Sequence, residues 1–193
     1  MKKLLKVTAL LLVAAAMFAG CKNNDDDSTG GALFSKEDVT EVITYNDITF
    51  SEGSWVASYS KNGTAADGST MIDSKTAEFT VAADSSVVFT KMVEYERQEG
   101  KIPAEATAEE IAFIQLMGYK ISGDKYYYEN TDEADADQLA NMSIYNIISM
   151  MDDFEIIKTN EDKSKYFGEA TYTQNSSKGG AAQITMSGYI MKK

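Results

Sequence analysis

Regular alternation of apolar and polar side chains is the feature that most constrains this fold. Between Gly53 and Ser60, the residues Trp55, Ala57 and Tyr59 share one side of an extended chain. The same period of two recurs over residues 76–81, 87–97, 166–172 and 182–190. A period of two is typical of a β-strand with one buried face. Strands that are half polar exclude a parallel sheet that is buried on both sides.

The predicted core follows from this alternation. In the segment 87–97 we place Phe89, Val93 and Tyr95 on one face. We expect Trp55 to be buried near one end of the sheet. The other residues expected in the core are Tyr59, Phe79, Phe89, Ile184 and Met186.

Turn signals separate the alternating segments. They are Asn62-Gly63, Ala83 to Ser86, Gly123-Asp124 and Asn175 to Gly180. Shorter β-rich segments are expected at Val42–Tyr45, Ile48–Phe50 and Phe154–Lys158. About eight strands joined mostly by short connections indicate an antiparallel meander.

The period changes to that of a helix in two places. Thr107 and Glu110 form a capping box, and Gly118 is a natural end for the helix that follows. Asp135 and Gln138 give a weaker start to an apolar stripe that runs from Leu139 to Met151. We expect these helices to cover a face or an open end of the sheet through Ile111, Ile114, Ile144, Ile147 and Ile148. The predicted fold is therefore mainly β (α+β), an antiparallel β-meander, barrel-like or half-barrel, of about eight strands with two interrupting helices.

Composition excludes several classes of function. The chain of 193 residues has no histidine and one cysteine. Disulfides within the chain, zinc sites of Cys and His, and His-based catalytic triads are therefore excluded. A net charge of −12 argues against a general nucleic-acid binder. We expect no cofactor, no metal and no catalysis.

The N-terminus has the pattern of a secretory signal. Lys2, Lys3 and Lys6 precede an apolar run of about 13 residues, shorter than the ~20 that a membrane span needs. Phe18-Ala19-Gly20-Cys21 follows and resembles the lipobox of bacterial lipoproteins. The resemblance implies cleavage after Gly20 and acylation (palmitate) of Cys21, which would anchor the protein in the bacterial cell envelope. Lys22 after the cysteine implies the outer membrane, with the domain facing the periplasm or the surface.

This organisation divides the chain into three parts. Residues 1–20 are the predicted signal peptide, residues 21–34 a flexible acidic tether, and residues 35–193 a single globular β-rich domain. After cleavage the chain would carry 15 Lys and Arg against 30 Asp and Glu, a net charge of −15. That charge repels anionic headgroups, so the lipid would hold a domain that stands off the bilayer.

A second resemblance concerns the domain. Gly53-Ser54-Trp55 at the start of the first well-patterned strand looks like the first motif of lipocalins and of lipocalin-like lipoproteins. There the Trp closes one end of an eight-stranded β-barrel. Two features differ: the only Arg, Arg97, lies in the middle of the chain, and two helices interrupt the strands. Another antiparallel α+β fold accommodates the same pattern, as does Trp55 as an ordinary core residue.

Few residues stand out as functional candidates. Asp132, Glu133, Asp135 and Asp137 lack the spacing of a calcium loop and are better read as a solvated helix start. In Tyr126-Tyr127-Tyr128, alternation places Tyr126 and Tyr128 on one face and Tyr127 on the other. The candidate ligand-binding residues are thus Trp55, Tyr126 and Tyr128. The predicted role is non-catalytic binding of a small apolar ligand in a lipocalin-like core; the alternative is an envelope interaction protein that binds other proteins through its outer face.

Overall fold

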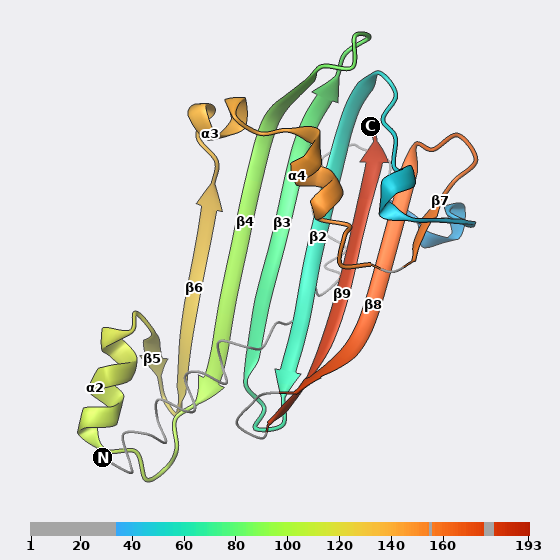
Figure 1. Ribbon diagram of the computed structural model, residues 1–193. Helices are drawn as coiled ribbons and strands as arrows, with labels where there is room; N and C mark the ends of the chain where they lie inside the picture. Colours follow the sequence, from blue (N-terminus) through green and yellow to red (C-terminus); the bar gives the residue numbers. More distant parts are fainter. Residues whose placement is uncertain (1–33, 155, 176–179) are drawn as a thin grey trace.

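The computed structural model describes residues 34–154, 156–175 and 180–193. One antiparallel sheet holds nine strands in the order β1-β7-β8-β9-β2-β3-β4-β6-β5 (Figure 1). β1 and β5 form its two edges, so the sheet is open. The predicted mainly β fold is confirmed, and its shape is a half-barrel and not a closed barrel.

The five long strands form the body of the sheet. They are β2 (Gly53–Ala65), β3 (Thr70–Val81), β4 (Val87–Lys101), β8 (Lys165–Asn175) and β9 (Ala181–Lys192). The others are β1 (Glu41–Ile43), β5 (Lys120–Ser122), β6 (Lys125–Glu133) and β7 (Ile157–Thr159). The helices are α2 (Ala108–Leu116), α3 (Ala136–Ala140) and α4 (Ile144–Ser149), with 3₁₀ turns η1 (Lys36–Asp38) and η2 (Tyr45–Asp47).

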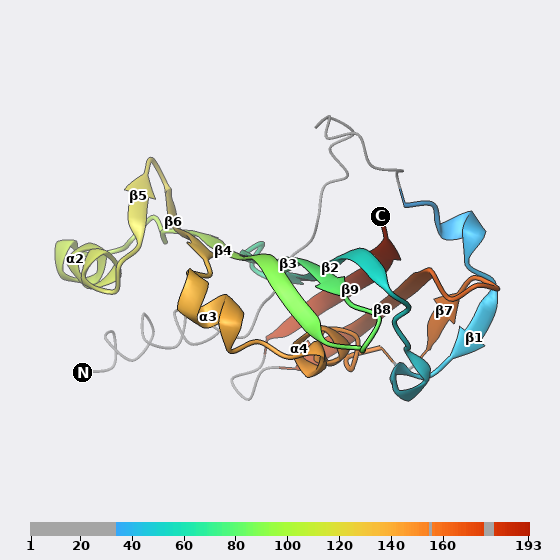
Figure 2. The same ribbon diagram turned by 90° about the horizontal axis from the view of Figure 1, so that it is seen from above.

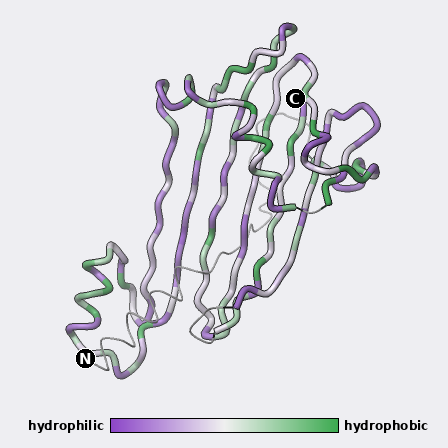
Figure 3. The backbone as a smooth tube through the Cα atoms, in the orientation of Figure 1, coloured by the Kyte–Doolittle hydropathy of each residue, from purple (hydrophilic) through white to green (hydrophobic). Residues whose placement is uncertain are grey.

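The main core lies between the sheet and α4. Figure 2 shows α3 and α4 on the same side of the sheet, which we call the front face. Apolar residues gather around α4 and the β3–β4 turn, whereas β6 and the second half of β4 are hydrophilic (Figure 3). The side chain of Trp55 is fully buried, and Ile147 of α4 belongs to the same core cluster. All six core residues predicted from the alternation are buried: Trp55, Tyr59, Phe79, Phe89, Ile184 and Met186.

A close approach explains how the segment after α4 reaches the sheet. Gly168 of β8 and Gly188 of β9 are direct cross-strand partners. The ring of Phe154 lies over both, and a Cβ added at Gly168 would come within 2.7 Å of it. Because neither glycine has a side chain, the ring of Phe154 packs directly on the backbone of β8 and β9. This packing sets the distance between the α4 segment and the sheet.

The first predicted turn is wrong. Asn62-Gly63 lies inside β2, where Gly63 pairs with Met71. The chain instead reverses after Ala65, whose N–H donates to the carbonyl of Ser69 at 2.9 Å. Gly68 adopts a φ of +81°, which favours glycine, and the turn forms there.

The predicted face of β4 is partly wrong. Phe79 pairs with Phe89, but Glu78 pairs with Lys91, so Thr90 is an extra residue in a β-bulge. The bulge reverses the alternation beyond it. Met92 therefore shares the front face with Phe89, whereas Val93 and Tyr95 point to the opposite, back face.

The second predicted helix is two helices. Ser143 interrupts the stripe because its N–H donates to the side chain of Asn146 at 2.7 Å, which starts α4 as a separate helix. The predicted strand at Ile48–Phe50 is absent, although Phe50 packs edge-on against Trp55 with ring centroids 5.1 Å apart.

The first predicted helix forms but lies elsewhere. Its capping box is present at Thr107 and Glu110, and Gly118 follows it with a φ of +86°. α2 lies beside β5 at the edge of the sheet, where Ile114 is buried outside the main core (Figure 1). The second predicted helix, present as α3 and α4, covers the sheet as expected, whereas α2 does not.

Candidate functional site: the front groove

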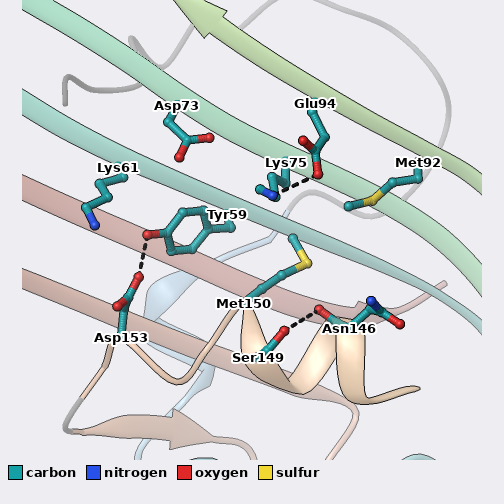
Figure 4. A pocket seen from close by; sticks show the side chains of 10 residues that line it. All are labelled: Tyr59, Lys61, Asp73, Lys75, Met92, Glu94, Asn146, Ser149, Met150 and Asp153. Atoms are coloured by element: carbon teal, nitrogen blue, oxygen red, sulfur yellow. Dashed lines mark hydrogen bonds and ion pairs between the residues drawn. The ribbon is translucent and has the colours of Figure 1, made fainter. Parts of the chain in front are cut away.

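A polar hollow lies beneath α4. It has a volume of about 300 Å³, with β2, β3 and β4 as its floor and α4 and the turn after it as its roof (Figure 4). A second hollow of about 450 Å³ continues along β3, β4 and β6. Asp73, Lys75 and Glu94 line both. We call the two hollows together the front groove.

Strand alternation explains why these side chains meet. Tyr59 pairs with Lys75, and Lys75 with Glu94, across three neighbouring strands. Directly paired residues point to the same face of a sheet. One row of the sheet therefore supplies a phenol, an ammonium and a carboxylate to the floor of the groove.

Tyr59 fastens the roof to the floor. Its hydroxyl donates a 2.7 Å hydrogen bond to Oδ2 of Asp153, in the turn after α4 (Figure 4). Burial, and secondly the hydrogen bond to Asp153, raises the pKa of the Tyr59 phenol far above its ordinary range. The phenol is therefore neutral at physiological pH and holds Asp153 at the rim of the groove.

Asp73 is a half-buried acid in the floor of the groove. Its burial raises the pKa of its carboxyl above the usual value, and nearby Lys75 partly offsets this. Nζ of Lys75 lies 2.7 Å from Oε1 of Glu94. Lys61, the cross-strand partner of Asp73 on β2, also lowers the Asp73 pKa, so Asp73 is a half-buried carboxylate that two lysines compensate only in part.

The roof contributes uncharged polar groups. The hydroxyl of Ser149 donates to the carbonyl of Asn146 at 3.0 Å, and the side-chain oxygen of Asn146 accepts from the N–H of Ser143. The amide nitrogen of Asn146 has no hydrogen bond to any residue in the described ranges. It faces the groove as a donor (Figure 4).

The whole groove is acidic. Five carboxylates line it, namely those of Asp73, Glu94, Glu96, Asp132 and Asp153. Two lysines, Lys61 and Lys75, accompany them. Met92 and Met150 add adaptable apolar surface near the α4 end. This lining suits a ligand that carries positive charge along an apolar stem.

The sequence candidates lie outside the groove. Trp55 is enclosed by aromatic rings, and its Nε1 donates to the carbonyl of Ser51 at 3.0 Å. Tyr126 is also buried and contacts Tyr119 edge-on, while the partly exposed Tyr128 tilts against the same ring. The enclosing rings around Trp55 belong to Phe50, Phe79 and Tyr166.

The structure does not bring these candidates together. Trp55 lies at the Lys192 end of β2, whereas Tyr126 pairs with Gly100 near the other end of β4. The predicted alternation of the three tyrosines is confirmed, because Tyr127 lies on the back face near Arg97. The groove occupies the middle of the sheet between the two aromatic groups.

The remaining predicted features are the acidic cluster before α3 and the N-terminal segment. Asp135 caps α3, accepting from the N–H of Gln138 at 2.9 Å, as expected for a helix start. Asp132 instead lines the groove. Among the described residues, no group of three or more potential metal ligands comes together. Cys21, the signal peptide and residues 21–33 of the tether lie outside the described residues.

The α-helices are short. None of those in the described ranges has the length and hydropathy of a membrane span. Comparison of the chain with protein-family models, with curated proteins and with solved structures found no match.

Proposed function

We propose that this is a lipid-anchored protein of the bacterial cell envelope with a non-catalytic binding role. Its front groove binds a positively charged ligand that carries amino or guanidinium groups. The observation that carries this proposal is the excess of carboxylates in the groove, five against two lysines. Charge of one sign along a cleft raises the local concentration of ligands of the opposite sign.

The membrane partner in this proposal is the lipid on Cys21. The lipobox-like sequence supports it, and Lys22 supports the outer membrane. Two or more acyl chains anchor a protein stably where one does not. A tether between the lipid and the domain would leave the groove accessible to ligands in the aqueous phase.

The polar lining favours a charged ligand over the small apolar ligand that the lipocalin resemblance implies. An apolar ligand needs an apolar cavity. The Trp55 end of the sheet, where the resemblance would place it, is filled by the rings of Phe50, Phe79 and Tyr166. An ammonium group of the ligand would donate hydrogen bonds to the carboxylates of Asp73 and Asp153. A hydrocarbon would displace water from both carboxylates without replacing those hydrogen bonds.

The second candidate role is binding of another protein through the outer surface. One observation favours it: β7 covers only three residues of β8, and the rest of that edge has no partner strand among the described residues. Unpaired strand edges are common sites of protein association.

A titration followed by NMR tests the groove. Spermidine is the cationic probe, added to the ¹⁵N-labelled chain, and citrate at equal ionic strength is the anionic control. We expect spermidine to shift the amide signals of Tyr59, Lys75 and Asn146 along one saturating curve. No shifts, or shifts spread evenly over the acids of both faces, would contradict the proposal.

A further inference from the structure

β8 leaves most of one edge without a partner strand. β9 pairs with β8 over its whole length, but β7 pairs with it only at Tyr166–Gly168. The N–H of Lys192 in β9 donates to the carbonyl of Ser164. Because alternate residues turn their backbone groups to each neighbour in an antiparallel ladder, odd-numbered residues of β8 point away from β9. Within the described ranges, no strand pairs with the outward N–H and C=O groups of Glu169, Thr171, Thr173 and Asn175.

The sheet has a second open edge, which differs in charge. β5 pairs with β6 only at Lys125–Tyr127, so residues 128–133 are open there. That stretch carries Glu129, Asp132 and Glu133, and charged side chains discourage an edge strand from pairing with another chain. Residues 170–175 of β8 carry no charge at all. Glu169, just before them, forms an ion pair with Lys36 at 2.7 Å.

The open edge of β8 is symmetric about Tyr172. It begins after Gly168, the last residue paired with β7, and ends with the strand at Asn175. A two-fold axis at Tyr172 would pair Thr171 with Thr173 of a second copy. Every outward backbone group of one edge then meets its complement on the other.

Side chains on both faces favour this register. Thr171 and Thr173 form Thr–Thr pairs on the back face, and the two copies of Tyr172 meet on the front face. Tyr172 is 40% exposed and lies beside Ile184 of β9. No like charges face each other.

We infer that two copies of this chain associate through the open edges of β8, antiparallel about Tyr172, into one sheet that continues across both molecules. A single strand pair buries less than the ~1,600 Å² of a standard interface, so the dimer dissociates readily in solution. This inference deepens the second candidate role and needs neither the groove nor the lipid.

Disulfide trapping tests the interface in the full-length chain with Cys21→Ser, so that any new cysteine is alone. Tyr172→Cys would face its own copy in a non-hydrogen-bonded pair, where Cα atoms lie ~4.5 Å apart. That spacing suits a disulfide. We expect a disulfide-linked dimer as the main product of mild oxidation. Thr131→Cys, on the charged edge of β6, is the matched control and should remain monomeric.

Two further experiments fix the register. A mixture of Ala170→Cys and Gln174→Cys chains should give mixed dimers, while each chain alone should not crosslink. Thr173→Pro removes an outward N–H without touching the pairing with β9, a position where an edge strand accepts proline. It should abolish crosslinking through Tyr172→Cys and leave the melting temperature unchanged.

Several results would overturn the inference. Equal crosslinking of Thr131→Cys and Tyr172→Cys would show random collision, and Ala170→Cys homodimers as abundant as mixed dimers would exclude the register. If Tyr172→Cys does not fold, sedimentation of the Cys21→Ser chain replaces it. In that experiment we expect the dimeric fraction to rise with protein concentration and to disappear in Thr173→Pro. A monomer at every concentration would contradict the inference. Either result leaves spermidine binding unchanged, because the groove lies apart from this edge.

Discussion

The hydroxyl of Tyr59 donates a 2.7 Å hydrogen bond to Asp153, 94 residues later in the chain. The bond joins the central strand of the sheet to the turn after α4, and so closes one side of the front groove. This hydrogen bond and the apolar packing of Ile147 and Phe154 thus hold the roof of the groove on the sheet.

Tyr59→Phe removes this contact and keeps the ring. We expect the free energy of unfolding to fall by about 0.5–1.5 kcal/mol, the usual net contribution of one hydrogen bond. Hydrogen exchange should accelerate in α4 more than in β9, because only the roof is released. Tyr145→Phe, which changes an exposed hydroxyl on α4 itself, is the control and should leave both quantities unchanged.

Asp73→Asn should stabilise the protein at neutral pH. Burial raises the pKa of the Asp73 carboxyl, so the folded state binds its proton more tightly than the unfolded state. The charged form therefore destabilises the fold, and that penalty appears as the pH rises through the window above the usual Asp pKa. Asp73→Asn should have a higher melting temperature than the parent at pH 7.

The advantage of Asp73→Asn should shrink as the pH falls below that window, since the parent side chain is then neutral as well. Glu52→Gln removes one charge from an exposed site and provides the control. A melting temperature that rises equally in both variants would assign the effect to net charge, and not to the burial of Asp73.

Trp55 is a direct probe of the core because it is the only tryptophan in the chain. Its side chain is fully buried, so its emission should be blue-shifted and resist quenching by acrylamide. Trp55→Ala should reduce the free energy of unfolding by about 3–5 kcal/mol. An emission maximum like that of indole in water would contradict the position of Trp55.

Cys21→Ser tests the proposed anchor. If the cysteine carries acyl chains, the parent protein partitions into the detergent phase of a Triton X-114 extraction and incorporates labelled palmitate. The variant should move to the aqueous phase and lose the label. Lys22→Asp, which keeps the cysteine, should retain the label. Unchanged partition of Cys21→Ser into the detergent phase would contradict the proposed lipid anchor.

Much of this fold follows from local patterns. The alternation around Trp55 and Ile184, the capping box at Thr107 and the Gly123-Asp124 turn were all predicted from residues close together in the sequence. Elements that depend on partners far along the chain were not. The bulge at Thr90 arises from pairing with β3, and nothing near Thr90 in the sequence indicates where the alternation reverses.

The groove could not be predicted for the same reason. Tyr59 was placed in the core by alternation, which is correct, but its role at the groove depends on Asp153 in a distant turn. Asp73 lies before the segment that alternation marked as a strand, so its position beside Lys75 and Glu94 required the full extent of β3. The aromatic candidates drew attention because they are rare or clustered, yet Trp55 and Tyr126 are buried at opposite ends of the sheet.

Calorimetric titration with spermidine, comparing two doubly substituted chains, tests the central claim most directly. Asp73→Asn with Asp153→Asn removes two charges from the groove, and Glu52→Gln with Glu161→Gln removes two exposed charges elsewhere. We expect the groove variant to bind spermidine roughly tenfold or more weakly than the parent, where each tenfold corresponds to about 1.4 kcal/mol. The control should bind within about twofold of the parent at physiological salt, where a Debye length of ~8 Å screens distant charges. Equal weakening in both variants, or no binding by the parent chain, would contradict the front groove as the binding site.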